Sequence, residues 1–137
     1  IDMTTREMVN IANLSYIISN VYEKDCPIEP QSRLGVVNNG RVCEHTFQYA
    51  ETDINRHVNS VRYVELLLNQ WNITHYDDYR VKRFEIAYVK ECLGGVTYNV
   101  AVNENDPLDA KVEISHMVEE KQEANCRARF VWAKREK

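Results

Sequence analysis

The stretch Asp53-Ile54-Asn55-Arg56-His57-Val58-Asn59-Ser60-Val61-Arg62-Tyr63 opens the most strongly patterned part of this chain. Apolar residues recur at helical spacing at positions 58, 61, 64, 67, 68 and 71, which predicts a mostly buried helix from His57 to about Trp71. Polar residues occupy every second position near its start: Asp53, Asn55, His57 and Asn59. Because a helix needs only one of them as an N-cap, the others indicate a second purpose.

That purpose fits chemistry at a carbonyl group. The N-terminus of a helix carries partial positive charge and free N–H donors, so a carbonyl placed there would be polarised. The same donors would stabilise the tetrahedral oxyanion that forms on attack. A carboxylate and an imidazole, such as those of Asp53 and His57, could orient or deprotonate a water molecule.

The sequence around this helix favours strands. Residues 41–52 are predicted to form one strand, with Phe47 and Tyr49 on a common face. Four more strands are expected after the helix, at 81–91, 96–103, 111–119 and 124–134. This order predicts an α+β domain in which an antiparallel sheet wraps around one long central helix.

Residues 1–40 have a different pattern. The stretch from Ile1 to Arg6 is interpreted as a strand end and a turn, and a short amphipathic helix is predicted over 11–21. Proline and turn-forming residues then predict a linker as far as Gly40. The packed domain is therefore expected to span 41–137.

Composition narrows the class of protein. The length of 137 residues and a hydrophobic content of 44% indicate one packed domain, and the net charge of −4 argues against a nucleic-acid partner. No two cysteines and no two histidines lie close together in the sequence, so neither a metal nor a cofactor is expected. No apolar run approaches the roughly 18 residues of a membrane span. Nothing in the sequence resembles a signal peptide either, and we therefore expect a reduced, cytoplasmic protein with no membrane partner.

Two motifs resemble those of a known family. The opening stretch is similar to D-x-N-x-H-V-N-N-x-x-Y of the acyl-acyl carrier protein thioesterases, with Ser60 in place of the second asparagine. Downstream, Phe84-Glu85-Ile86-Ala87-Tyr88-Val89-Lys90-Glu91-Cys92 resembles the family's I-x-Y-x-x-E-C strand. Arg56 is a departure, since a small or amide residue is common there. The resemblance implies a hot-dog fold and the release of fatty acids from acyl carrier protein.

The resemblance also implies which residues act. The side chains that match the family's polar group are Asp53, Asn55, His57 and Glu91, and Cys92 matches a cysteine proposed as a nucleophile. The backbone N–H groups of Val58 and Asn59 would hold the carbonyl oxygen.

Glu91 and Cys92 are adjacent, so in a regular strand they point to opposite faces and only one can face His57 without a bulge. Parity with Phe84 favours Cys92, whereas the family pattern favours Glu91. The family pattern is given more weight, and Cys92 stays a candidate.

Members of the family carry two hot-dog domains in tandem. The resemblance implies that 1–40 is the end of a preceding strand plus a helical linker and that 41–137 is the second domain. A homodimer partner, or a separate first-half chain, is then expected to complete the acyl pocket. The acidic carrier protein is expected to dock on basic side chains: Arg80, Lys82, Arg83, Arg127 and Arg129.

Two alternatives stay open. One is a stand-alone hot-dog thioesterase acting on coenzyme A esters, and the other is a non-catalytic acyl-binding half that needs a partner domain. The remaining histidines are expected to be structural. His116 is predicted to be a satisfied core or edge histidine, His75 a surface loop residue, and His45 a strand residue with no visible partner.

Overall fold

The computed structural model describes Asp2, Thr4–Thr5 and Glu7–Glu136. It divides the chain into two compact units, Ile1–Pro30 and Gln31–Lys137. The division falls ten residues before the expected domain start at 41. Residues 31–40, predicted to be linker, therefore belong to the second unit.

The first unit contains little regular structure. It has a 3-10 helix, η1 (Ile11–Asn13), and a single helical turn, α1 (Ser15–Ile18). The predicted helix over 11–21 is interrupted at Leu14, whose φ of −105° and ψ of 89° are not helical.

The start of the first unit contains the turn that was predicted there. The Asp2 carboxylate accepts hydrogen bonds from the N–H groups of Thr4 and Thr5 at 2.7 and 2.9 Å. The predicted strand end includes Ile1, Met3 and Arg6, which lie outside the described residues.

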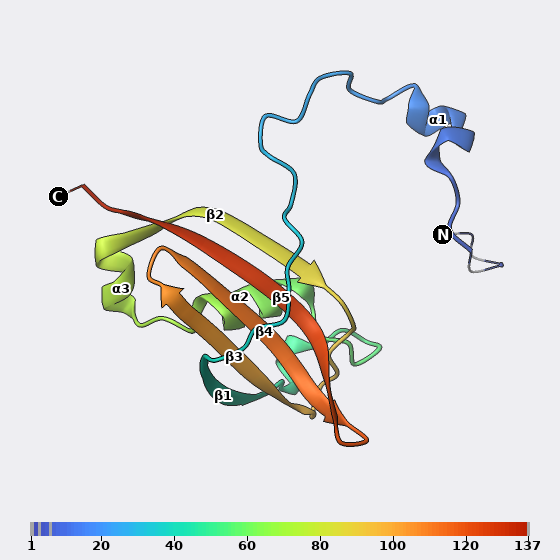
Figure 1. Ribbon diagram of the computed structural model, residues 1–137. Helices are drawn as coiled ribbons and strands as arrows, with labels where there is room; N and C mark the ends of the chain where they lie inside the picture. Colours follow the sequence, from blue (N-terminus) through green and yellow to red (C-terminus); the bar gives the residue numbers. More distant parts are fainter. Residues whose placement is uncertain (1, 3, 6, 137) are drawn as a thin grey trace. The chain divides into compact units, whose positions relative to one another are not determined.

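The second unit is built on a five-stranded sheet (Figure 1). Its spatial order is β1-β3-β4-β5-β2, and every neighbouring pair is antiparallel. The strands are β1 (Arg41–Thr46), β2 (Tyr79–Tyr88), β3 (Thr97–Asp106), β4 (Asp109–Val118) and β5 (Lys121–Lys134). The helical elements are η2 (Tyr49–Glu51), α2 (Ser60–Leu68) and α3 (Ile73–Asp78). The predicted α+β class is confirmed.

The central helix α2 is shorter than predicted. It begins at Ser60 rather than His57, because the Asn59 side chain accepts a hydrogen bond from the Val61 N–H at 3.0 Å and caps the helix there. It ends at Leu68, although Trp71 beyond it is still buried. The predicted apolar stripe is only partly correct, since Val61 is 58% exposed.

The core lies between α2 and one face of the sheet. Alternate residues of the strands point toward the helix, as the period of two along a strand requires. From α2, Tyr63 and Leu67 enter this core. The facing sheet residues include Val100, Val102, Val112, Ile114, Ala128, Phe130 and Trp132.

The opposite face of the sheet carries charged residues and a covering segment. Residues 31–40 cross it (Figure 1), and Ser32 donates hydrogen bonds to the Glu85 carboxylate from its N–H and its hydroxyl at 2.8 and 2.7 Å. The segment reaches β1 through Gly40. A Cβ at this position would lie 2.0 Å from the carbonyl oxygen of Val102, so only glycine fits.

The predictions for the three histidines outside the predicted site have different outcomes. His116 is a satisfied histidine as predicted, with Nδ1 2.7 Å from Asn125 Oδ1, and it lies on β4 between β3 and β5. The prediction for His75 is wrong, because the polar loop forms α3 and packs its ring 4.5 Å from that of Trp132. His45 does have neighbours, since its Nε2 lies 3.6 Å from the Glu51 carboxylate.

Candidate active site

The segment from Asp53 to His57 forms a tight loop before α2. Asp53 Oδ1 accepts hydrogen bonds from the N–H groups of Asn55 and His57 at 2.8 and 3.0 Å. The Asp53 N–H donates to the His57 carbonyl at 2.9 Å, which closes the loop. Arg56 has a φ of +64°, a left-handed conformation that suits glycine or an amide residue better. Asp53 therefore shapes the loop that carries His57.

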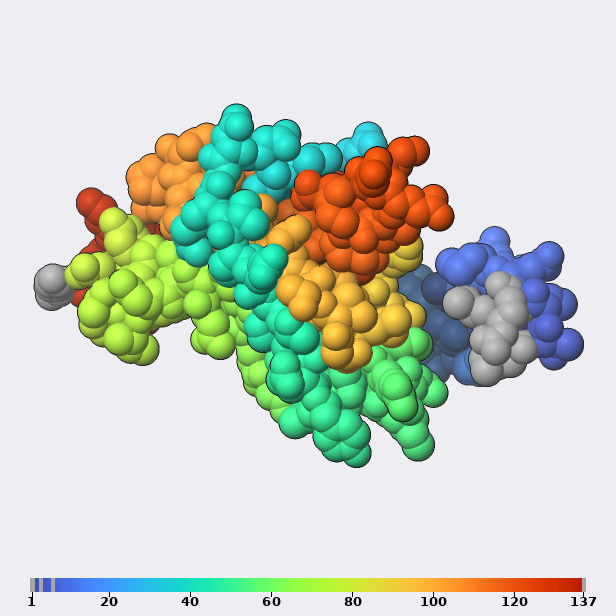
Figure 2. Space-filling view, turned by 90° about the horizontal axis from the view of Figure 1, so that it is seen from below, coloured from blue at the N-terminus to red at the C-terminus, as the bar shows by residue number. Residues whose placement is uncertain are grey.

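A second loop, residues 89–95, is joined to the first through the main chain. The Val58 N–H donates to the Cys92 carbonyl at 2.9 Å, and the Gly94 N–H donates to the Arg56 carbonyl at 3.0 Å. Gly94 fits against Thr52, whose Cγ2 would lie 2.7 Å from any Cβ at that position. Figure 2 shows the teal-green residues around 50–58 at the surface beside the yellow-orange residues around 90–96.

This junction brings His57 and Glu91 together. His57 Nε2 lies 3.4 Å from Glu91 Oε2, and the two side chains are 38% and 72% exposed. An imidazole and a carboxylate in contact, both open to solvent, can bind and polarise a water molecule. The structure thus pairs two of the predicted residues across 34 positions of sequence.

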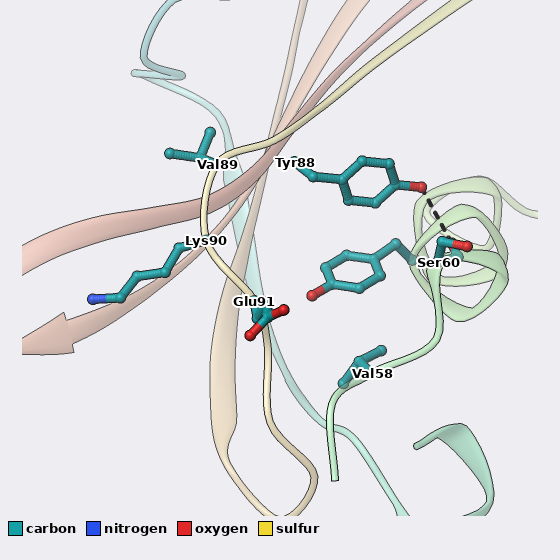
Figure 3. Close-up of a pocket in the computed structure, with 7 residues that line it drawn as sticks. Val58, Ser60, Tyr88, Val89, Lys90 and Glu91 are labelled. Atoms are coloured by element: carbon teal, nitrogen blue, oxygen red, sulfur yellow. Dashed lines mark hydrogen bonds between the residues drawn. The ribbon is translucent and has the colours of Figure 1, made fainter. Parts of the chain in front are cut away.

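A cavity of about 240 Å³ lies beside Glu91. Figure 3 shows Glu91 and Val58 at its edges, Lys90 pointing away, and Tyr88 reaching α2 through a 3.4 Å hydrogen bond to the Ser60 carbonyl. Six of its seven lining residues come from the first turn of α2 and the end of β2 with its following loop: Ser60, Tyr63, Tyr88, Val89, Lys90 and Glu91. Typical ligand pockets hold about 300–1,000 Å³, so this cavity is small.

The structure does not place Cys92 at the cavity, which corrects its assignment as a candidate nucleophile. The residue is fully buried, and its N–H donates to the Tyr63 hydroxyl at 2.6 Å. Burial raises the pKa of the Cys92 thiol to about 11, despite opposing hydrogen bonds with Tyr63 and Tyr98. A neutral thiol in the core is a poor nucleophile. β2 ends at Tyr88, so the parity argument does not extend to residues 91 and 92.

The predicted oxyanion donors also need correction. The N–H of Val58 is bonded to the Cys92 carbonyl, and the N–H of Asn59 donates to the Glu51 carbonyl at 3.0 Å. Neither is free to hold a substrate oxygen. Asn55 is exposed in the loop, and within the described residues no side-chain hydrogen bond joins it to His57 or Glu91.

Three of the predicted docking cations already have acidic partners. Arg83 lies 2.7 Å from Glu85, Arg127 lies 2.7 Å from Glu113, and Arg129 pairs with Asp109 at 2.6 Å. These pairs lie on the sheet face opposite α2. Because their charges are already paired, the three arginines are not free charges for docking. Arg80 and Lys82 are exposed on β2, and the described residues contain no ion pair with either.

Sequence reasoning missed Tyr63 as part of the site's framework. Its hydroxyl links α2 to the loop that carries Glu91, by accepting the hydrogen bond from Cys92. The signal was present, because Tyr63 is the last residue of the matched motif.

Among the described residues, no group of three or more His, Cys, Asp or Glu side chains could hold a metal ion. The helices in this part of the chain are all too short or too polar to cross a membrane.

Comparison with known families gives a match over residues 37–134 to the acyl-ACP thioesterase C-terminal domain. The match covers most of the chain, including both loops of the site. The chain belongs to this family. The predicted resemblance to the acyl-ACP thioesterases is therefore confirmed, and so is the hot-dog fold.

Solved thioesterases resemble this acyl-ACP thioesterase domain. An acyl-ACP thioesterase from Bacteroides thetaiotaomicron is 35% identical with a TM-score of 0.70, covering 81% of this chain and 44% of that one. The 12:0-ACP thioesterase from Umbellularia californica has a TM-score of 0.73 at 16% identity, covering 98% of this chain and 53% of that one. A putative oleoyl thioesterase from Lactobacillus plantarum has a TM-score of 0.65 at 17% identity, covering 100% and 55%. The last two likenesses show the fold alone.

The thioesterase domain described here spans about half the length of these structures. A comparison with curated protein sequences returns no match.

Proposed function

We propose that this domain hydrolyses fatty acyl thioesters on acyl carrier protein and releases free fatty acid. The observation that carries the proposal is the 3.4 Å contact between His57 Nε2 and Glu91 Oε2 beside a cavity at the start of α2. Family membership supports thioester hydrolysis as the reaction class. The Bacteroides structure, described as an acyl-ACP thioesterase, supports the carrier protein as the form of the substrate.

In the proposed mechanism, the Glu91 carboxylate takes a proton from a water molecule while His57 orients that water. The oxygen attacks the thioester carbon, and the resulting oxyanion needs a donor. The N–H of Ser60 is the first of α2, and no hydrogen bond from it is recorded among the described residues. We assign the oxyanion to this group and to the positive end of the helix. Collapse of the tetrahedral intermediate breaks the C–S bond, and the leaving sulfur takes the proton held by Glu91, which releases the carrier thiol and the free acid.

The rest of the acyl pocket is proposed to come from a partner, either a first hot-dog domain or a second copy of this chain. The 240 Å³ cavity offers room for the reacting end of the substrate only. A larger hollow of about 710 Å³ lies along the other side of the Asp53–His57 loop. Its rim includes Tyr49 and Ile54, which are 94% and 98% exposed and supply apolar surface for a covering chain.

Hydrolysis assays on matched carrier-protein and coenzyme A esters test this function. We expect release of free fatty acid from the carrier ester with a higher kcat/KM than from the coenzyme A ester. Glu91→Gln should lower kcat by at least about 100-fold, because the amide cannot accept the proton. Glu44→Gln, at an exposed site on β1, is the matched control and should leave kcat unchanged.

Three outcomes would contradict the proposal. A Glu91→Gln variant with the wild-type rate would remove the proposed base, and a preference for the coenzyme A ester would favour a stand-alone acyl-CoA thioesterase. Binding of acyl carrier protein without any turnover would favour the non-catalytic half.

A further inference from the structure

Glu91 lies on a loop and has a mostly exposed side chain, yet the site needs its carboxylate at a fixed distance from His57. An exposed glutamate has many rotamers, and a flexible main chain beneath it would spread them further. We infer that Asn125 and His116 are positioning residues that hold Glu91 opposite His57. The inference rests on the proposed function, in which Glu91 acts on water.

Asn125 is the extra residue of a β-bulge between β4 and β5. Ile114 pairs with Cys126, and the next residue, Ser115, pairs with Ala124, so Asn125 has no partner across β4. A bulge breaks the regular alternation of side chains and can aim one of them in a new direction. Asn125 is fully buried despite its amide. A buried amide that is hydrogen-bonded on both atoms specifies one arrangement of its neighbours.

The Asn125 hydrogen bonds converge on the loop that carries Glu91. Its backbone carbonyl accepts from the N–H groups of Val89 and Lys90 at 2.9 and 3.0 Å. Its side-chain Nδ2 donates to the Glu91 carbonyl at 3.0 Å. Three consecutive residues after β2 are thus fixed by one residue of β5.

His116 fixes the direction of the Asn125 amide. The Glu91 carbonyl can only accept, so the amide nitrogen must face it and Oδ1 must face His116. His116 Nδ1, 2.7 Å away, therefore carries the proton and donates it. The chain of contacts runs from His116 through Asn125 to the Glu91 main chain, and neither His116 nor Asn125 lines the cavity.

Substitutions at His116 test the inference with little disturbance of packing. His116→Phe keeps an aromatic ring against Tyr98, whose ring centroid is 5.4 Å away, but has no donor. His116→Asn restores an N–H donor at the position of Nδ1. We expect kcat for the carrier ester to fall about tenfold or more in His116→Phe with KM nearly unchanged, since the substrate contacts remain. His116→Asn should recover most of the lost kcat.

Asn125→Ala removes the central contact and should lower kcat by about 100-fold. Its matched control is Asn103→Ala, which deletes another side-chain hydrogen bond to a main-chain carbonyl, 2.6 Å from Asn38 and away from the site. If Asn125→Ala fails to fold, the His116 pair decides the question. Amide hydrogen exchange at residues 89–91 should speed up in His116→Phe and return toward wild type in His116→Asn, a readout that needs no turnover.

A His116→Phe variant with wild-type kcat and wild-type exchange at residues 89–91 would overturn the inference. A His116→Asn variant with a kcat as low as that of His116→Phe would also overturn it. The imidazole ring, and not its hydrogen bond to Asn125, would then be what supports activity. Failure of the proposed function would give a different result from failure of the positioning role, because Glu91→Gln would then keep the wild-type kcat. An inactive Glu91→Gln together with a fully active His116→Phe would reject the positioning role alone.

Discussion

At the residue scale, Asp53 combines a structural role with a proposed chemical one. Its Oδ1 accepts two main-chain hydrogen bonds and so shapes the loop before α2. Its carboxylate could also orient the attacking water beside His57. An asparagine side chain offers the same accepting oxygen without the charge. The two roles can therefore be separated.

Asp53→Asn is expected to keep the thermal stability of the wild type while kcat falls by about 100-fold. Asp53→Ala should lower the free energy of unfolding by about 1 kcal/mol as well, since two main-chain N–H groups lose their acceptor. Thermal denaturation and steady-state kinetics measure both effects. Asp77→Asn, exposed on α3, is the control. Equal kcat in Asp53→Asn and the wild type would leave Asp53 with the loop role only.

Individual site residues were predicted from the sequence less completely than the helices and strands. The motif identified His57 and Glu91, which the structure pairs. The competing choice of Cys92 followed from strand parity, and it failed because β2 ends at Tyr88 and the residues after it form a loop. Asn125 lies inside the predicted strand 124–134, and nothing in that strand's pattern singled it out. A bulge depends on how two strands are aligned, so no single-strand pattern reveals it.

At the element scale, an ion-pair cluster ties the segment 31–40 to the outer face of the sheet. Glu85 is 5% exposed and pairs with Arg83 at 2.7 Å and with Arg129 at 3.4 Å. Burial alone would raise the pKa of Glu85, but hydrogen bonds from Ser32 and from Arg83 outweigh it and lower the pKa to about 2. The ionised carboxylate thus stabilises the fold.

The sign of this effect predicts a pH dependence. Because the folded pKa of Glu85 lies below its ordinary value of 4.5, its contribution is complete above pH 4.5 and is lost as the pH falls toward 2. Glu85→Gln should lower the free energy of unfolding by about 2 kcal/mol at pH 7. This difference from the wild type should narrow between pH 4.5 and pH 2.

Urea denaturation at several pH values measures the Glu85 effect. Glu44→Gln, an exposed glutamate of β1, should show no such difference at any pH. A constant gap between Glu85→Gln and the wild type from pH 7 to pH 2.5 would contradict the assignment.

The elements themselves were largely predictable. Four strands after one apolar helix follow from turn residues and alternation, and β3, β4 and β5 begin within three residues of the predicted positions. The helix start was misplaced because Asp53, Asn55 and Asn59 are all good caps, and the sequence does not say which one is used. In the structure Asn59 is the cap, and Asp53 closes the loop before it.

At the scale of the whole molecule, two basic residues without acidic partners among the described residues allow the proposed docking of the carrier protein to be tested. Arg80 and Lys82 are exposed on β2, an edge strand of the sheet, whereas the other three candidates are neutralised by acidic partners. Exposed charges attract an acidic partner over about 10 Å at 0.1 M salt. Docking on them should therefore weaken as salt rises.

The double substitution Arg80→Glu with Lys82→Glu should raise KM for the carrier-protein ester about tenfold at low salt and leave KM for the coenzyme A ester nearly unchanged. The effect should shrink as salt is added. Lys121→Glu, exposed at the start of β5, serves as the charge-matched control. Equal increases in KM for both esters would place the effect on the site instead of the docking surface.

The division into domains was only partly readable from sequence. The linker region was recognised by its prolines and turns, but its last ten residues pack on the sheet. That packing depends on Glu85 and Arg127, which lie more than 50 positions away and contact Ser32 and the Leu34 carbonyl. Local composition cannot report such distant contacts.

The main-chain junction between the two site loops has an evolutionary consequence. The hydrogen bonds among Arg56, Val58, Cys92 and Gly94 use only backbone atoms, so the spacing of His57 and Glu91 does not require a particular side chain at the exposed position 56. The loop can therefore carry an arginine at position 56 despite its left-handed backbone conformation. Diversity can accumulate around the reacting groups without moving them, which makes this loop a natural place for specificity to diverge.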